Sequence, residues 1–143
     1  MLFPKKVKFR KWQNARKSEA RLAMPETRGT TLAFGSFGLK ADTASRVKSN
    51  QIEASRKAIA RTITKVGKMW IRIFPDRPYT QKGAQVGMGK GKGDPQGYVF
   101  EVRPGRVLFE VDGVDEATAV KALRKAGAKL PVKMHVVRRT EKV

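Results

Sequence analysis

Apolar residues recur along the chain with two different periods, and each period predicts an element. Between residues 50 and 68, Ile52, Ile59, Ile63 and Val66 fall close to one line when successive residues are rotated by 100°. We therefore predict a helix over 50–68 that buries this line.

The ends and the outer side of this helix also carry signals. Asn50 is a favourable N-cap residue, Glu53 follows three positions later as in a capping box, and Gly67 supplies a stop. The side opposite the apolar line is basic and lacks carboxylates, and Glu53 in the first turn is the only acid of the predicted helix. A solvent-facing side usually mixes charges that pair at i,i+4, so we interpret this side as phosphate-facing. Its cations are Lys57, Arg61, Lys65 and Lys68.

A second helix is predicted after Asp115, which is placed to cap it. Its apolar positions repeat at i, i+4, i+7 and i+11, and Gly127 and Pro131 close it. These apolar positions are Ala119, Leu123, Ala126 and Leu130.

Alternation of apolar and polar residues predicts strands. MWIRIF (69–74) has Met69, Ile71 and Ile73 on one face, and the PDRP that follows ends the strand. YVFEVRPGRVLFEVDG (98–113) forms two alternating runs around Pro-Gly, which suits the centre of a type II turn, so we predict a hairpin. VKMHVV (132–137) supplies a final strand.

LAFGSFGLKA (32–41) is predicted to be extended. We expect its two phenylalanines, Phe34 and Phe37, to anchor the core, and Gly35 and Gly38 to mark a bulge or a close approach of backbone.

These elements predict an α+β fold, with a mostly antiparallel sheet and two helices packed on it. The length of 143 residues suits one domain over 1–143. Within it we expect an extended basic arm at 1–30 and a long glycine-rich loop at 83–97.

The balance of charged residues indicates what kind of partner the chain binds. The chain has 32 Lys and Arg against 12 Asp and Glu, a net charge of +20. Residues 1–72 hold 18 basic and 4 acidic side chains, whereas residues 73–143 hold 14 and 8. Such an excess repels itself, so we expect a polyanionic partner, with nucleic acid first.

The basic run KKVKFRKWQNARK (5–17) includes Phe9 and Trp12. Solvated tails are usually poor in aromatic residues. We therefore favour an arm that lies on RNA, with its cations on phosphates and its aromatic rings free to stack on bases.

GMGKGKGDPQG (87–97) has five glycines and alternates glycine with Lys90 and Lys92. It fits neither the phosphate-binding nucleotide loop nor the dinucleotide-binding pattern, since the required glycine spacings fail. A flexible linker is the plain alternative. A long loop inside a domain is more often functional, and side-chain-free residues let the backbone approach RNA closely.

Other chemistry finds little support in the sequence. Absence of cysteine excludes disulfides, zinc fingers and thiol nucleophiles. His135 alone, in a predicted strand, suggests no metal site, and no serine stands at a diagnostic spacing from it. No apolar run approaches the roughly 20 residues of a membrane span, and the start lacks an apolar signal region. We expect a soluble, intracellular, non-enzymatic protein without cofactor, metal or small-molecule substrate.

Several blocks of sequence together resemble the bacterial L-sixteen family of large-subunit ribosomal proteins. They occur in that family's order and spacing: FGSFGLKA, QIEASRKAI, GKMWIRIFPDRPYTQK, MGKGKG, RPGRVLFEVDGV and KLPVK. The resemblance covers nearly the whole chain and is weakest between Gln13 and Thr31.

The resemblance implies a structural constituent of the ribosome that binds large-subunit rRNA, lies beside neighbouring ribosomal proteins and A-site tRNA near the peptidyl-transferase centre, and supports late subunit assembly. The expected rRNA-binding residues are Lys5, Lys6, Lys8, Arg10, Lys11, Trp12, Arg16, Lys57, Arg61, Lys65, Lys68, Arg72 and Lys82. The expected loop facing tRNA and the peptidyl-transferase centre is Met88, Gly89, Lys90, Gly91, Lys92 and Gly93.

The chain also departs from the family pattern. Gly87 replaces the usual arginine before MGKGKG, Asn50 replaces another arginine, and Tyr98 follows the loop where tryptophan is common. These departures suit a divergent bacterium or an organelle, and we expect the cytoplasmic ribosome of a bacterium. Two other classes stay open at this point: a nucleotide-binding or nucleic-acid-processing enzyme, and a DNA-compacting protein.

Overall fold

Two antiparallel sheets contain the seven strands found in residues 2–14 and 18–140, which are the residues that the computed structural model describes. The first sheet has the order β3 (Lys68–Ile71), β6 (Val107–Asp112), β1 (Phe37–Ala41) and β7 (Met134–Arg138). The second has the order β2 (Ser45–Lys48), β5 (Asp94–Val102) and β4 (Arg77–Gln81). The α+β class is confirmed, but the single sheet that we predicted is wrong.

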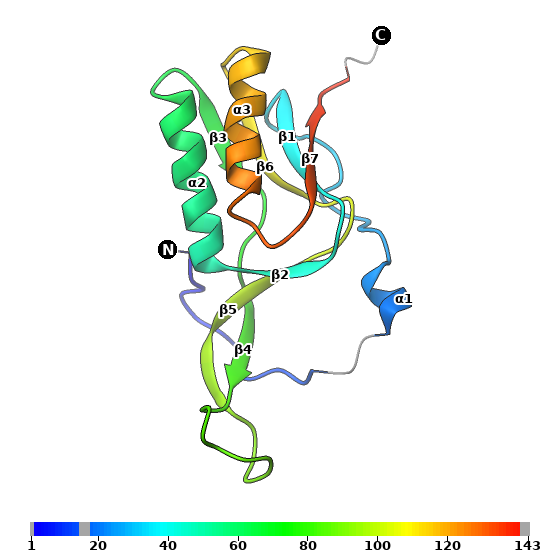
Figure 1. Cartoon of the computed structure of the whole chain (residues 1–143), viewed down its shortest axis with the longest axis vertical. Coiled ribbons are helices and arrows are strands. Elements are labelled where there is room, and N and C mark those ends of the chain that lie inside the picture. Colours follow the sequence, from blue (N-terminus) through cyan, green and yellow to red (C-terminus); the bar gives the residue numbers. More distant parts are fainter. Residues whose placement is uncertain (1, 15–17, 141–143) are drawn as a thin grey trace.

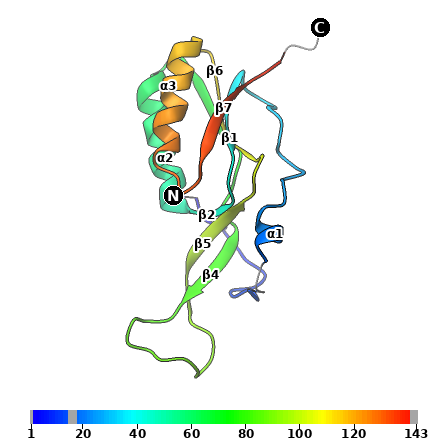
Figure 2. The ribbon, with the colours of Figure 1, turned by 45° about the vertical axis from the view of Figure 1, so that its right-hand side comes forward.

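Two helices cover one face of the four-stranded sheet (Figures 1 and 2). They are α2 (Ser49–Ile63) and α3 (Glu116–Gly127), which also pack against each other. A short helix, α1 (Glu19–Leu22), lies in the N-terminal segment. The core between helices and sheet includes Ile52, Ile59, Ile63, Ala119, Leu123, Ala126, Leu130, Leu39, Phe109 and Val111. The apolar line predicted for the second helix is therefore confirmed, although Leu130 lies beyond the end of α3, and the line predicted for the first is confirmed as far as Ile63.

The start of α2 differs from the prediction. The N-cap is Lys48, two residues before the predicted Asn50, and the Lys48 N–H donates to Gln51 Oε1 at 2.9 Å. Glu53 instead forms two hydrogen bonds with the Arg56 guanidinium, at 2.6 and 3.0 Å. The proposed Asn50 and Glu53 capping pair is therefore wrong.

The end of α2 also comes earlier than expected. The last helical residue is Ile63, and Thr64 follows with φ of 56° and ψ of −153°. Val66, expected on the buried line, is 78 % exposed because the chain has already left the helix. Gly67 does not stop the helix but permits packing, since a Cβ there would lie 2.8 Å from Val114 Cγ1.

At the other helix, Asp115 caps α3 as predicted and accepts from the Thr118 N–H at 3.2 Å.

The predicted hairpin over 98–113 is wrong in its pairing. A turn does form at Pro104-Gly105, where Gly105 has φ of 94° and the Arg106 N–H donates to the Arg103 carbonyl at 3.2 Å. β5 then pairs with β2 and β4, whereas β6 pairs with β1 and β3. The turn therefore carries the chain from one sheet to the other.

The face of the four-stranded sheet opposite the helices is covered by the extended chain before β1 (Figure 2). Gly38 makes room for Leu32, and Gly35 approaches the Val111 backbone, as the predicted close contact requires. Phe34, expected in the core, is 56 % exposed and stacks on Trp70, with ring centroids 6.0 Å apart. The core-anchor prediction is wrong for Phe34, whereas Phe37 packs against the core.

The true hairpin is formed by β4 and β5, and the glycine-rich loop is its tip (Figure 1). Residues 94–97, which we placed in the loop, belong to β5, so the connection runs from Lys82 to Gly93. Pro78 is tolerated inside β4 because β4 is the edge strand of its sheet.

Candidate nucleic-acid interface

The described part of the N-terminal arm, residues 2–14, starts beside the base of α2 and reaches the β4–β5 hairpin (Figure 1). The Ser49 hydroxyl donates to the Leu2 carbonyl at 3.0 Å, and Phe3 meets Tyr98 edge to face at 6.3 Å. The arm is thus attached to the domain by its uncharged residues. Its predicted cations stay exposed: Lys5, Lys6, Lys8, Arg10 and Lys11.

Trp12 lies where the arm meets the hairpin. The Arg77 guanidinium lies 5.4 Å from its ring centroid, and Arg77 also donates to Asn14 Oδ1 at 2.9 Å. The Lys92 ammonium donates to the Trp12 carbonyl. The arm and the glycine loop, predicted separately, are therefore brought together, and Trp12 stays 41 % exposed. Arg77 was missed, because its place between two prolines gave no binding signal.

The tip of the glycine loop presents a turn of backbone with few side chains. Gly89, Lys90 and Gly91 have φ of 99°, 58° and 90°, and a Cβ at Gly89 or Gly91 would meet no atom within 4 Å. Met88 is fully exposed, and the half-buried Lys82 donates to the Gly89 carbonyl from inside the loop. The backbone there is open to a close partner, with Lys90 and Lys92 exposed beside it.

The third predicted group of cations lies away from the loop. Lys57 and Arg61 are exposed on α2, Lys65 follows the helix, and Lys68 begins β3. The end of α2 that they approach is opposite the glycine loop in the long direction of the molecule (Figure 1). The domain therefore offers two separate cationic regions, one at the arm and hairpin and one along α2.

Arg72, also predicted to bind rRNA, has a partner within the domain. Its guanidinium donates to Glu110 Oε1 at 2.7 Å and lies 5.0 Å from the Phe34 ring centroid. Sequence reasoning missed this pair, because Glu110 occupies an alternating strand position that looks solvent-facing.

Glu110 is fully buried and holds the covering segment in place. Burial by itself would raise the pKa of its carboxyl, but hydrogen bonds from the N–H groups of Ala33, Gly35 and Phe34 and from Arg72 outweigh it and lower that pKa. The three backbone bonds measure 3.0, 2.6 and 2.6 Å. This carboxylate is a structural anchor rather than a catalytic group.

Two further residues that the sequence analysis singled out are Arg16 and His135. Arg16 lies outside the described residues. Within residues 2–14 and 18–140, no group of three or more His, Cys, Asp or Glu side chains could hold a metal ion. In the same residues, no helix is long and apolar enough to cross a membrane. His135 lies on the surface with Nδ1 2.5 Å from Asp42 Oδ1.

Comparison with known proteins identifies the family. The sequence model of the family described as ribosomal protein L16p/L10e matches residues 4–137. The chain is 53 % identical over 141 residues to the large ribosomal subunit protein uL16 of Rickettsia massiliae (strain Mtu5), covering 99 % of this chain and 100 % of that protein. It is 52 % identical, with the same coverage, to the protein of that name from Rickettsia bellii (strain OSU 85-389). The chain therefore belongs to the ribosomal protein L16p/L10e family, whose members are structural proteins rather than enzymes.

Proposed function

We propose that this protein is a structural constituent of the large ribosomal subunit that binds large-subunit rRNA. The observation that carries the proposal is a full-length family match in a chain whose exposed cations gather in two regions. Solvent-facing helix surfaces usually pair such cations with acidic side chains. In α2 the one acidic residue is Glu53, and it already forms an ion pair with Arg56. Association with neighbouring ribosomal proteins in the cytoplasm follows from the same membership.

The glycine loop is proposed to reach A-site tRNA near the peptidyl-transferase centre. Its support is the position at the free tip of a hairpin, the positive φ values and the exposed lysines. Backbone N–H groups without side chains can approach phosphate or sugar oxygens closely, and the lysines neutralise charge. Support for late subunit assembly is proposed through the arm, whose cations extend beyond the packed domain.

The α2 cations give the sharpest test of rRNA binding. If about ten cations of the protein engage phosphates, log affinity for its rRNA fragment should fall against log salt with a slope of about −7 to −9. The double variant Lys57→Glu, Arg61→Glu should bind more weakly and show a slope shallower by about two. Filter binding or fluorescence anisotropy from 50 to 300 mM salt measures both.

The matched control is Lys121→Glu with Lys125→Glu, which makes the same charge change at the same spacing on the exposed side of α3. It should bind RNA more tightly than the α2 variant, and both should melt within a few degrees of the unmodified protein. Equal loss of affinity from the two variants would contradict a specific α2 contact, and a flat salt slope would contradict rRNA binding itself.

A further inference from the structure

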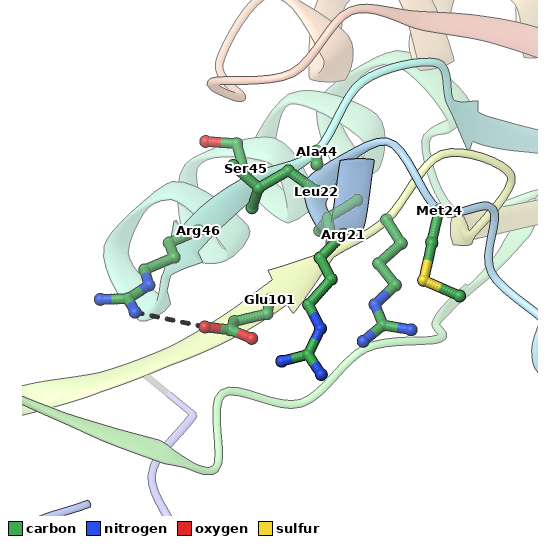
Figure 3. A pocket seen from close by; sticks show the side chains of 9 residues that line it. Arg21, Leu22, Met24, Ala44, Ser45, Arg46 and Glu101 are labelled. Atoms are coloured by element: carbon green, nitrogen blue, oxygen red, sulfur yellow. Dashed lines mark ion pairs between the residues drawn. The ribbon is translucent and has the colours of Figure 1, made fainter. Parts of the chain in front are cut away.

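A cavity of about 640 Å³ lies between α1 and the edge of the three-stranded sheet (Figure 3). None of the residues expected to bind RNA lines it, and its size suits a small ligand or a single nucleotide. The lining comes from α1 and the chain after it, from the start of β2, and from the end of β5. These residues are Arg21, Leu22, Met24, Ala44, Ser45, Arg46, Glu101, Val102 and Arg103.

Part of the cavity is apolar although it is open to solvent. Leu22 and Met24 are 46 % and 53 % exposed, so two large apolar side chains border the opening. Ala44 and Val102 add small apolar surface beside them. The thioether side chain of Met24 is flexible and packs well on aromatic rings. This part is suited to the flat face of a ring.

The charged part favours an anion. Glu101 Oε1 lies 3.3 Å from the Arg46 guanidinium and 3.2 Å from that of Arg77. Among the residues that the structure describes, no carboxylate pairs with Arg21 or Arg103. Two guanidinium groups therefore remain for a ligand, and their planar donors match phosphate oxygens.

We infer that this cavity receives one unstacked nucleotide of the bound RNA, with its base on Leu22 and Met24 and its phosphate on Arg21 and Arg103. The inference rests on the proposed rRNA binding and names a contact within it. An acidic peptide would satisfy the arginines but would leave the exposed apolar part without an aromatic ring. Proteins that read RNA commonly take unpaired bases into such mixed sites.

The first test removes the apolar contact while keeping every charge. The full-length double variant Leu22→Ala, Met24→Ala should bind the rRNA fragment about tenfold more weakly, because it removes the apolar surface that the base covers. Its salt slope should be unchanged, because neither side chain neutralises a phosphate. The control, Phe74→Ala, trims an exposed apolar side chain that belongs neither to the cavity nor to the two cationic regions, and it should bind like the unmodified protein.

The second test reports on the base directly. In protein labelled at its methionine methyl groups, the Met24 signal, identified with Met24→Leu, should move upfield when the rRNA fragment is added, because a base ring lies over it. The inference would be overturned if the unmodified protein bound the RNA normally, the Met24 signal did not move, and the Leu22→Ala, Met24→Ala variant bound the RNA as tightly as the unmodified protein. The proposed function would then still stand. Failure of the unmodified protein to bind the RNA would overturn both.

Discussion

At the scale of single residues, the best-determined group is Glu110. Its carboxylate is fully buried in the middle of β6, and it accepts hydrogen bonds from three backbone N–H groups and from the Arg72 guanidinium. Hydrogen bonds to the charged form favour that form, which explains the lowered pKa. Glu110 thereby fixes the segment that covers the outer face of the sheet, and with it the Phe34 and Trp70 stack.

Replacing Glu110 by glutamine should lower the free energy of unfolding by about 1–3 kcal/mol at pH 7, because it weakens charged hydrogen bonds in a buried place. Since the folded pKa lies below the ordinary 4.5, the ionised carboxyl stabilises the fold above about pH 4.5. That contribution is lost as pH falls through the folded pKa. Urea unfolding at several pH values from 7 to 3 should therefore show that the difference in free energy of unfolding between the unmodified protein and Glu110→Gln becomes smaller.

The control is Glu116→Gln, which neutralises a half-exposed carboxyl at the start of α3. We expect a change within about 0.5 kcal/mol, as for most exposed charges. If Glu110→Gln and Glu116→Gln lower the free energy of unfolding by the same amount, the anchoring role assigned to Glu110 is wrong.

At the scale of elements, the end of α2 shows how tertiary structure overrides a local pattern. The apolar line continues to Val66 in the sequence, but the helix ends at Ile63 because the chain must turn into β3. Thr64 makes that turn with a positive φ that a β-branched residue rarely adopts. Strain of this kind costs on the order of 1–3 kcal/mol.

Thr64→Gly should therefore stabilise the protein by about 1 kcal/mol, since the relief of strain exceeds the roughly 0.5–1 kcal/mol entropic cost of glycine. Thr62→Gly, in the last turn of α2, should destabilise it by about 1 kcal/mol, because glycine is a poor helix former. The midpoint of urea unfolding measures both. A destabilised Thr64→Gly protein would show that the backbone is not strained there.

At the scale of the whole molecule, charge and shape are arranged together. The helices and the four-stranded sheet form one end, and the β4–β5 hairpin extends from it to a tip with a loop and little apolar packing (Figures 1 and 2). The arm crosses to the hairpin and meets it through Trp12, Arg77 and Lys92. The molecule thus has a packed body and a projecting cationic end, which suits a protein that inserts between RNA surfaces.

This arrangement predicts that the loop and the arm have different roles, the loop in binding tRNA and the arm in uptake of the protein into the subunit. Large subunits reconstituted with Lys90→Gln, Lys92→Gln protein should take up the protein normally but bind A-site tRNA several-fold more weakly. Removing two lysines from the arm, as Lys5→Gln with Lys6→Gln, should instead lower uptake into the subunit. Filter binding of tRNA and quantification of the protein on purified subunits separate the two effects. Normal A-site binding with the loop variant would refute the tRNA contact.

The sequence by itself determined the features that depend on neighbouring residues: both apolar helix lines, the Asp115 cap, the Pro104-Gly105 turn and the excess of cations. Its family blocks also identified the family, because they are spread over nearly the whole chain. Only the tertiary structure decided which strands pair. The runs on either side of Pro104-Gly105 alternate like a hairpin, yet β6 is buried on both faces as a central strand while β5 joins another sheet. The burial of Glu110, the joining of arm and loop, and the cavity beside α1 likewise depend on contacts between residues far apart in the chain, which no local period encodes.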